Sequence, residues 1–464
     1  MRRASAVITA VLVSATVGCG GDNSRGDEPG SASGREAYAF PASPDASDRP
    51  VPPEVTAAVS LLVRSAVANA IDGAALDQVA RSGDPRLAWL LSDLLRFYQG
   101  SSDDDGLVDA FNRLTGVDVR DDPLFGDNSW RTVTDHLIAW DLPAPPRYRE
   151  LKAGLFLAIE PRWAPFFADR DSRIDWRLVS WGGVLLDHRP LGDPSLCPLG
   201  CIPALDDPKL TPASDGGWYP EDRLVFGVVV KGDAVAFPKN MMEVHEMVNI
   251  SIGGTRLGIP YCTLCGSAQA FVLDQLPSGV APPVLRTSGL LSRSNKVMFD
   301  RTSNSVLDTF TGRALSGPLQ DANVTLEQVS VVSSTWGEWK RAHPRTRIVA
   351  RDGGLGRSYP ADPLGGRDDR GPIFPVGDVD RRLPVQEQVV GVIDSDGTPV
   401  AFAVEQAKAV LAAGGEVAAA GVELVRDGGG LRARSRGGDE LASHQAFWFA
   451  WSQFHPETEL WDGD

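Results

Sequence analysis

Residues 226–237 read FGVVVKGDAVAF and residues 390–402 read VGVIDSDGTPVAF, and these two stretches decide the fold. Each contains an apolar residue followed by Gly-Val, then a turn with glycine, then Val-Ala-Phe. Alternating apolar side chains on both sides of a glycine turn are typical of a β-hairpin. The sequence therefore predicts two similar hairpins in the later part of the chain.

A second motif also occurs twice, as TWGEWKRAHPRT in residues 335–346 and FWFAWSQFHPET in residues 447–458. In each copy two tryptophans three positions apart share one helix face, and proline ends the helix one turn later. The two motifs occur in the same order in both copies. They predict an internally duplicated, β-rich α+β domain over residues 181–464, whose first half carries an inserted CxxC motif.

The region before this domain, residues 54–180, has the apolar spacing of helices packed on helices. Two sets of side chains each share one helical face: Val55, Val59, Leu62, Val63 and Val67, then Leu87, Leu90, Leu91, Leu94, Leu95 and Tyr98. Asp84 before Pro85 is typical of a helix start, and Gly116 of a helix end. The predicted fold class is α+β, with an N-terminal helical domain before the duplicated domain.

The acidic composition excludes most nucleic-acid binding. The 464 residues include 45 Lys and Arg against 61 Asp and Glu, for a formal net charge of -16. Such a surface repels phosphate backbones unless it has a basic stripe, and the sequence has none. The sequence also indicates no particular protein partner.

The first residues predict export. Arg2 and Arg3 precede an apolar run over residues 6–17, which has the length of a signal peptide and is too short to span a bilayer. The run ends at Cys19 in a sequence that resembles a bacterial lipobox. We therefore predict a signal peptide over residues 1–18 and diacylation of Cys19. The alternative is an ordinary secretory signal with an incidental cysteine.

Residues 19–53 predict a disordered tether, because they are rich in Gly, Ser and Pro and have almost no large apolar side chains. The expected location is the cell envelope, outside the cytoplasm. There the acyl chains on Cys19 would attach the protein to a membrane, which is the one partner that the sequence predicts.

Four cysteines remain once Cys19 is lipidated. Cys197 and Cys201 lie in CPLGC, and Cys262 and Cys265 lie in YCTLCG. An even number of cysteines in an oxidising compartment makes two disulfides the simplest interpretation.

The second pair predicts more specific chemistry. Predicted strands flank CTLCG, so its cysteines lie in a tight turn in which Gly266 adopts positive φ. A strand, CxxCG and a second strand form the shape of a metal knuckle, which supplies two thiolate ligands. The nearest candidate for a third ligand is His245, and Cys197 and Cys201 are further candidates if the fold brings them close. Zinc or copper suits these ligands.

Two other functions stay open at this point. In a thiol-disulfide oxidoreductase Cys262 would attack the substrate and Cys265 would resolve the intermediate, and the Cys262 pKa would then lie below about 8.5 without a metal. In a structural or interaction protein both cysteine pairs would be inert disulfides.

Six segments together resemble the bacterial and archaeal family known as domain of unknown function 3179. They are IPALDDPKL (202–210), VHEMVN (244–249), YCTLCGSAQAF (261–271), SGLLSRSNKVMFDR (288–301), WGEWKRAHPRT (336–346) and FPVGDVDRRLPVQEQVVGV (374–392). The family pattern usually has Trp and Pro where this chain has Val244 and Thr263. The resemblance covers roughly residues 201–403 and implies an extracytoplasmic, lipoprotein-like protein of unassigned activity.

Overall fold

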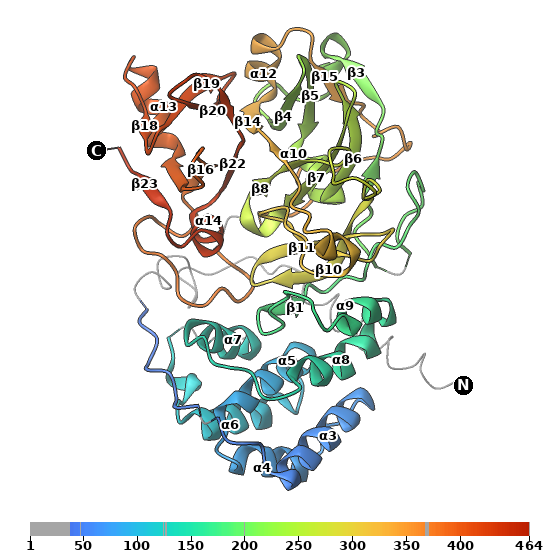
Figure 1. Cartoon of the computed structure of the whole chain (residues 1–464), viewed down its shortest axis with the longest axis vertical. Helices are drawn as coiled ribbons and strands as arrows, with labels where there is room; N and C mark the ends of the chain where they lie inside the picture. The colour runs from blue at the N-terminus through green and yellow to red at the C-terminus, as the bar shows by residue number, and fades with distance from the viewer. Residues whose placement is uncertain are drawn as a thin grey trace.

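The structure is a computed structural model that describes residues 38–46, 48–123, 125, 128–198, 200–366 and 371–463. The predicted signal peptide and Cys19 lie outside the described residues. The chain is a mixed α+β protein in which helices come first and a β-rich region follows (Figure 1). This order of elements confirms the predicted fold class.

Helices make up the N-terminal region, at the bottom of Figure 1. They are α3 (Pro53–Val67), α4 (Gly73–Arg81), α5 (Ala88–Tyr98), α6 (Asp104–Thr115), α7 (Ser129–Ala139), α8 (Tyr148–Ile159) and α9 (Ala164–Ala168). The predicted apolar faces of α3 and α5 are buried in one core. Asp84 accepts a hydrogen bond from the Arg86 N–H at the predicted helix start, and Gly116 ends α6 with a φ of 73°. No helix in the described ranges is long and apolar enough to cross a membrane.

A sheet in the order β1-β10-β11-β12 covers the helices. Its strands are β1 (Val179–Trp181), β10 (Leu285–Ser292), β11 (Asn295–Asp300) and β12 (Val306–Asp308). Leu290, Val297, Phe299 and Val306 of this sheet belong to the same hydrophobic core as the helices. The helices and this sheet therefore share one apolar interior. The boundary predicted between residues 180 and 181 falls inside β1.

A second sheet, in the order β13-β9-β7-β6-β2, carries the CxxC motif. Its strands are β2 (Leu205–Asp206), β6 (Met247–Ile252), β7 (Thr255–Cys262), β9 (Ala270–Val272) and β13 (Gln328–Val329), and β8 (Ser267–Ala268) pairs with β7 off this path. The short helices α10 (Lys239–His245) and α11 (Gly317–Asp321) also lie in this half of the chain.

Both predicted hairpins form, and each is the centre of a sheet. The sheet around the first hairpin has the order β14-β4-β5-β15-β3. Its strands are β3 (Leu210–Pro212), β4 (Leu224–Val230), β5 (Asp233–Pro238), β14 (Val331–Thr335) and β15 (Arg347–Val349). The other runs β22-β16-β17-β23, with β16 (Gln388–Ile393), β17 (Pro399–Ala403), β22 (Ser443–Phe447) and β23 (Glu459–Trp461). In each sheet the hairpin is antiparallel, one neighbour is antiparallel and the other is parallel.

The Trp-Trp-His-Pro motifs form matching helices, α12 (Trp336–Ala342) and α14 (Trp448–Phe454), as predicted. The Trp339 ring covers the strand glycine Gly227, and the Trp451 ring covers Gly391, so closely that a Cβ atom there would lie 2.4 Å and 2.0 Å from the ring. Glycine is therefore needed at both strand positions. The two halves share strand order and this packing, and their origin by duplication stays a prediction.

The last sheet, β18-β19-β20-β21, packs beside the second hairpin sheet in the left-hand lobe of Figure 1. Its strands are β18 (Ala418–Ala419), β19 (Val422–Asp427), β20 (Gly430–Ser435) and β21 (Glu440–Leu441), and α13 (Val404–Ala412) precedes it. Apolar residues of α13, the hairpin and this sheet form one core.

Candidate functional site

The CxxC motif forms the turn between β7 and β8. Cys262 is the last residue of β7, and η5 (Thr263–Cys265), one turn of 3-10 helix, follows directly. Cys262 pairs with Ser267 across the turn. Gly266 has a φ of 59°, a conformation that glycine adopts without strain. The predicted arrangement of a strand, a tight turn with positive φ at Gly266 and a second strand is confirmed.

This turn lies against the C-terminal half of the molecule. A Cβ atom at Gly266 would lie 2.9 Å from the Phe447 ring of β22, and both cysteines belong to a core with residues of β16, β17 and α14. Cys262 is 2% exposed and Cys265 is fully buried. Both are free thiols. The two thiols are thus held where the halves of the β-rich region meet.

The turn between β10 and β11 provides polar contacts to both sulfurs. Cys262 Sγ lies 3.7 Å from the Ser294 carbonyl oxygen, and Cys265 Sγ lies 3.5 Å from the same oxygen. Cys265 Sγ also lies 3.6 Å from Asn295 Oδ1. Each thiol has a single hydrogen, so these oxygens are alternative acceptors for it, and the contacts place both sulfurs beside one turn.

Lys296 and Glu246 form a buried ion pair next to the thiols. The Lys296 ammonium donates hydrogen bonds to the carbonyl oxygens of Glu246 and Tyr261 and lies 3.3 Å from Glu246 Oε2. The Thr263 hydroxyl donates to Glu246 Oε1 at 3.3 Å. Burial lowers the pKa of Lys296, while the Glu246 charge opposes that shift. One positive and one negative charge therefore act on the sulfurs from close range.

The environment separates the pKa values of the two thiols. Burial opposes ionisation of Cys262, but hydrogen bonds from the Cys265 thiol and the Lys296 backbone N–H outweigh burial and hold the Cys262 pKa below its ordinary value. Burial and the adjacent Cys262 sulfur raise the pKa of Cys265 well above its ordinary value. Cys262 is therefore the thiol that ionises first.

A cavity of about 710 Å³ opens beside Cys262, between the helical region and the sheets. Cys262, Thr263, Glu246 and Lys296 line it, and Cys265 does not. The opposite wall comes from the helical region. From the helical region the cavity is lined by Arg96, Asn128 and Trp130. The sheets and the loops add Ile202, Glu243, Leu290, Leu291, Val297 and Phe374. Cys262 thus contributes to the cavity wall, although it is only 2% exposed, and Cys265 does not.

His245, the predicted third metal ligand, uses both ring nitrogens elsewhere. Nδ1 lies 2.7 Å from the Pro203 carbonyl oxygen, and Nε2 lies 2.7 Å from the Tyr359 hydroxyl. The ring is 1% exposed, and burial lowers its pKa to about 4 although the Pro203 hydrogen bond opposes the shift. The structure does not bring His245 into a ligand group with Cys262 and Cys265.

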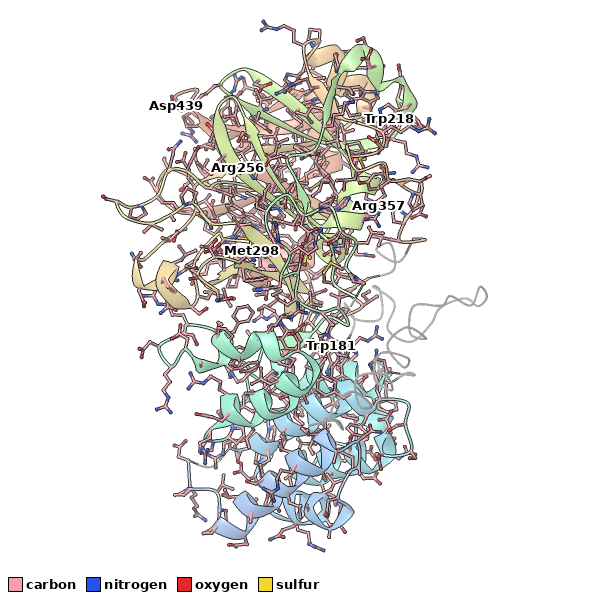
Figure 2. All side chains as sticks on the ribbon, turned by 90° about the vertical axis from the view of Figure 1, so that its right-hand side faces the viewer. Trp181, Trp218, Arg256, Met298, Arg357 and Asp439 are labelled. Atoms are coloured by element: carbon pink, nitrogen blue, oxygen red, sulfur yellow. A yellow bond between two sulfur atoms is a disulfide. The ribbon has the colours of Figure 1, made fainter. Side chains whose placement is uncertain are left out.

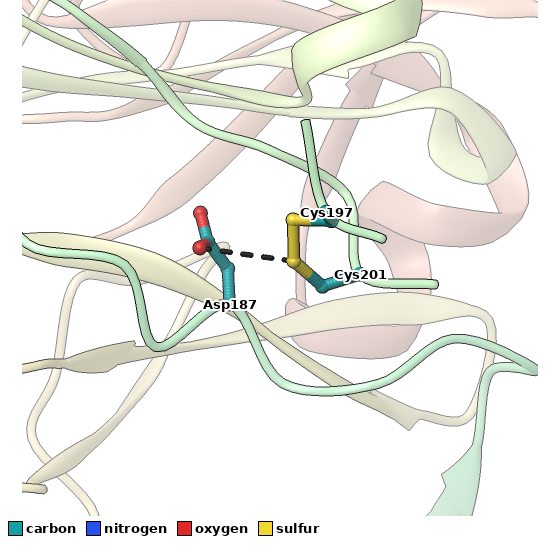
Figure 3. Close-up of side chains that lie close together, drawn as sticks. All are labelled: Asp187, Cys197 and Cys201. Carbon is teal, nitrogen blue, oxygen red and sulfur yellow. Dashed lines mark hydrogen bonds between the residues drawn. A yellow bond between two sulfur atoms is a disulfide. The ribbon is translucent and has the colours of Figure 1, made fainter. Parts of the chain in front are cut away.

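Among the described residues, the group with three His, Cys, Asp or Glu ligand atoms within 4.8 Å of one another is Asp187, Cys197 and Cys201 (Figure 3). Such a group could hold a metal ion if both cysteines were reduced. Here Cys197 and Cys201 form a disulfide. The interpretation that predicted two disulfides is therefore confirmed for this pair but not for Cys262 and Cys265, which are free thiols. Both Asp187 oxygens accept hydrogen bonds from Arg189, each at 2.8 Å. The carboxylate therefore stabilises the loop around the disulfide.

Lys296 and Glu246 are the site residues that the sequence analysis missed. Two signals were available, because Glu246 directly follows His245 in VHEMVN, and Lys296 is a charged residue directly before the apolar run Val297-Met298-Phe299. A charge in a buried strand needs a partner, since an isolated buried charge costs several kcal/mol. The sequence could not show that each of these residues is the partner of the other.

Comparison with known proteins identifies the family. The family model described as "Protein of unknown function (DUF3179)" matches residues 199–436. This range contains α10, the CxxC turn and Lys296. No curated protein and no solved structure matches the chain. Because the matched range is just over half of the 464 residues, the chain belongs to the DUF3179 family of proteins of unknown function.

Proposed function

We propose that Cys262 and Cys265 form a dithiol–disulfide exchange centre that acts on a peptide or low-molecular-mass disulfide in the 710 Å³ cavity. The observation that carries the proposal is the position of the two thiols. Cys262, 2% exposed, is among the residues that line the cavity, whereas the fully buried Cys265 is not. An attacking thiol needs access and thiolate character, whereas a resolving thiol needs only to reach its neighbour.

The exchange has two steps that balance in atoms and electrons. The Cys262 thiolate attacks one sulfur of the substrate disulfide, forming a mixed disulfide and releasing the other substrate sulfur as a thiolate. Cys265 then gives its proton to that thiolate and attacks the Cys262 sulfur. That attack breaks the mixed disulfide and releases the second substrate sulfur as a thiolate, which takes a proton from water. The substrate therefore leaves with both sulfurs reduced, after receiving two electrons in all, and the Cys262–Cys265 disulfide remains. A partner dithiol must reduce this disulfide before the next cycle.

The charges beside the thiols support this assignment of roles. The Lys296 ammonium favours the Cys262 thiolate, while Glu246 opposes ionisation of both sulfurs. Cys262 is therefore the nucleophile, and Cys265 stays protonated until the mixed disulfide forms. Zinc or copper binding by the same two sulfurs is the competing function, and His245 does not support it because both of its nitrogens are already engaged.

The test is a redox titration of the purified chain in thiol–disulfide buffers, followed by alkylation and peptide mass spectrometry. We expect Cys262 and Cys265 to titrate together as a two-electron couple at roughly −120 to −270 mV. The Cys197–Cys201 disulfide, which serves as an internal control, should stay oxidised over that range. Cys265→Ser should accumulate a mixed disulfide at Cys262, and Cys262→Ser should accumulate none.

Two outcomes would reject the exchange function. One is alkylation of Cys262 in the native chain with an apparent pKa at or above about 8.5, the value of an ordinary thiol. The other is a stoichiometric zinc or copper ion in the purified protein that is lost in Cys262→Ser, since this would establish the metal function instead.

We also propose that the mature chain begins at a diacylated Cys19 and is attached to a membrane outside the cytoplasm. The apolar run over residues 6–17 and the lipobox-like sequence before Cys19 support this. The Cys197–Cys201 disulfide fits an oxidising compartment. In a bacterial host we expect the full chain to incorporate an alkyne-labelled fatty acid. Cys19→Ala should abolish the labelling, and equal labelling of both chains would contradict the proposal.

A further inference from the structure

The lining of the thiol cavity includes apolar side chains that are only partly buried. They come from separate segments of the chain and are Ile202, Leu264, Leu364, Ile373 and Phe374. Leu264 lies inside the CxxC turn itself, between the two cysteines. Partly exposed apolar side chains that gather at one cavity are typical of a binding site. A substrate that reaches Cys262 therefore meets apolar side chains.

The carboxylates of the lining are already paired with cations. Glu246 Oε2 lies 3.3 Å from Lys296 Nζ, and Glu243 Oε1 lies 3.1 Å from Lys239 Nζ. Glu243 and Glu246 are balanced in the lining by Lys296 and Arg96. The lining therefore has no net formal charge that would attract an ionic substrate.

Arg96 is covered by aromatic rings of the same cavity. Its guanidinium carbon lies 4.6 Å from the centre of the Trp130 ring and 5.6 Å from that of the Phe374 ring. Its Nε donates to the Trp181 carbonyl oxygen at 2.8 Å. Figure 2 shows Trp181 where the helical region meets the sheets. Cation–π contacts of this kind hold the two rings at the cavity wall, where they add apolar area.

Part of the cavity wall has no side chains. It is formed by Gly182, Gly183 and Gly289, and the Gly182 N–H donates to the Gly289 carbonyl oxygen at 2.9 Å. Gly289 has a φ of 78°, and a Cβ atom there would lie 2.3 Å from the Val184 carbonyl oxygen, so the fold itself requires this glycine. A wall of bare backbone lets the backbone of another polypeptide approach closely.

We infer that this cavity selects disulfides of polypeptides in which apolar side chains flank the cysteine, in preference to small or anionic disulfides. The inference rests on the proposed exchange function. The flanking side chains pack against Leu264, Ile373 and Phe374, while the substrate backbone lies along the glycines. A volume of about 710 Å³ is in the range of sites that enclose drug-sized ligands, and a small disulfide would leave most of it empty. Acidic flanking residues lose these contacts, because burying a carboxylate without a partner is costly.

The test is the rate at which different disulfides oxidise the full chain with Cys262 and Cys265 reduced. The reaction is quenched with acid, and alkylation and mass spectrometry measure the Cys262–Cys265 disulfide. The oxidants are the disulfide dimers of the capped tripeptides Leu-Cys-Phe, Ser-Cys-Ser and Asp-Cys-Glu, and diethyl disulfide, which is apolar but small. Each rate is divided by the rate of the same disulfide with dithiothreitol, which removes differences in intrinsic reactivity. We expect the corrected rate of the Leu-Cys-Phe dimer to exceed each of the others at least about tenfold.

Variants separate apolar recognition from thiol chemistry. Leu264→Ser and Phe374→Ser should each lower the corrected rate of the Leu-Cys-Phe dimer about tenfold and leave that of the Ser-Cys-Ser dimer within about twofold. A change in the reactivity of the thiols would move both rates together. Leu264→Ser alone decides the question if Phe374→Ser does not fold. Leu61→Ser is the matched control, because Leu61 is a 39% exposed leucine of α3 outside the cavity lining, and it should change neither rate.

Three results would overturn the inference and leave the exchange function in place. They are equal corrected rates for the Leu-Cys-Phe and Ser-Cys-Ser dimers, a corrected rate of diethyl disulfide that matches the Leu-Cys-Phe dimer, and an equal effect of Leu264→Ser on both peptides. Oxidation of the chain by none of the disulfides would reject the exchange function and this inference with it. Failure of the substrate preference and failure of the exchange function are therefore distinguishable.

Discussion

Replacing Arg286 with methionine is expected to lower the free energy of unfolding by about 3–5 kcal/mol. The Arg286 side chain is fully buried, and its guanidinium holds both Asp206 oxygens at 2.9 and 2.7 Å. It also lies 3.7 Å from Asp187 Oδ2, which is buried as well. Methionine fills a similar volume but leaves Asp206 buried without its cation. The loss therefore reflects an uncompensated charge and lost hydrogen bonds rather than a cavity.

Urea unfolding of the purified chain, followed by tryptophan fluorescence, measures this loss. The matched control is Arg113→Met, which removes an ion pair whose two side chains are 49% and 51% exposed. That change should cost no more than about 1 kcal/mol, because water already screens the pair. Equal effects of Arg286→Met and Arg113→Met would show that the buried network around Asp206 does not stabilise the fold.

The second large effect concerns acid. The folded-state pKa of His245 is about 4, below the unfolded value of about 6.5, because burial disfavours the imidazolium. Between these values the unfolded chain binds a proton that the folded chain does not. Stability therefore falls as the pH drops below 6.5, by about 1.4 kcal/mol per pH unit from this residue. From pH 6.5 to 4.5 the expected loss is about 2–3 kcal/mol.

His245→Gln isolates this contribution, since glutamine keeps a donor and an acceptor but does not titrate. The unfolding free energy of each chain is measured at pH 7, 6, 5 and 4.5, which gives two slopes of stability against pH. All other titrating groups contribute equally to both slopes, so their difference reports His245. The unmodified chain should lose about 2–3 kcal/mol more than His245→Gln over this range. Parallel slopes would mean that the ring accepts its proton inside the folded chain without cost.

Local patterns predicted those parts of the fold that depend on neighbouring residues. The hairpins at 226–237 and 390–402 form as predicted, because alternating apolar residues on both sides of a glycine turn favour a hairpin through short-range contacts. Gly266 adopts positive φ, and His343 and His455 end their helices, for equally local reasons. The close contact of Trp339 with Gly227 and of Trp451 with Gly391 was not predicted, because each joins a helix to a strand far away in the chain.

The candidate site was only partly predictable, because its contacts join residues far apart in the chain. Cys262 and Cys265 were found from their spacing and the turn between them. The sequence could not show that Lys296 lies beside them or that Tyr359, more than a hundred residues after His245, takes the imidazole nitrogen proposed for a metal. Hydrogen-bond partners of this kind follow from the packing of whole elements, and one sequence carries no direct signal for them.

By itself the sequence determined the order of helices and hairpins, the acidic charge and the position of the paired thiols, since each depends on residue type and short-range spacing. Only the tertiary structure decided which thiol faces a cavity, which charges act on it and which histidine nitrogens are already bonded. Burial and electrostatic neighbours set these properties, and both arise when distant segments pack together.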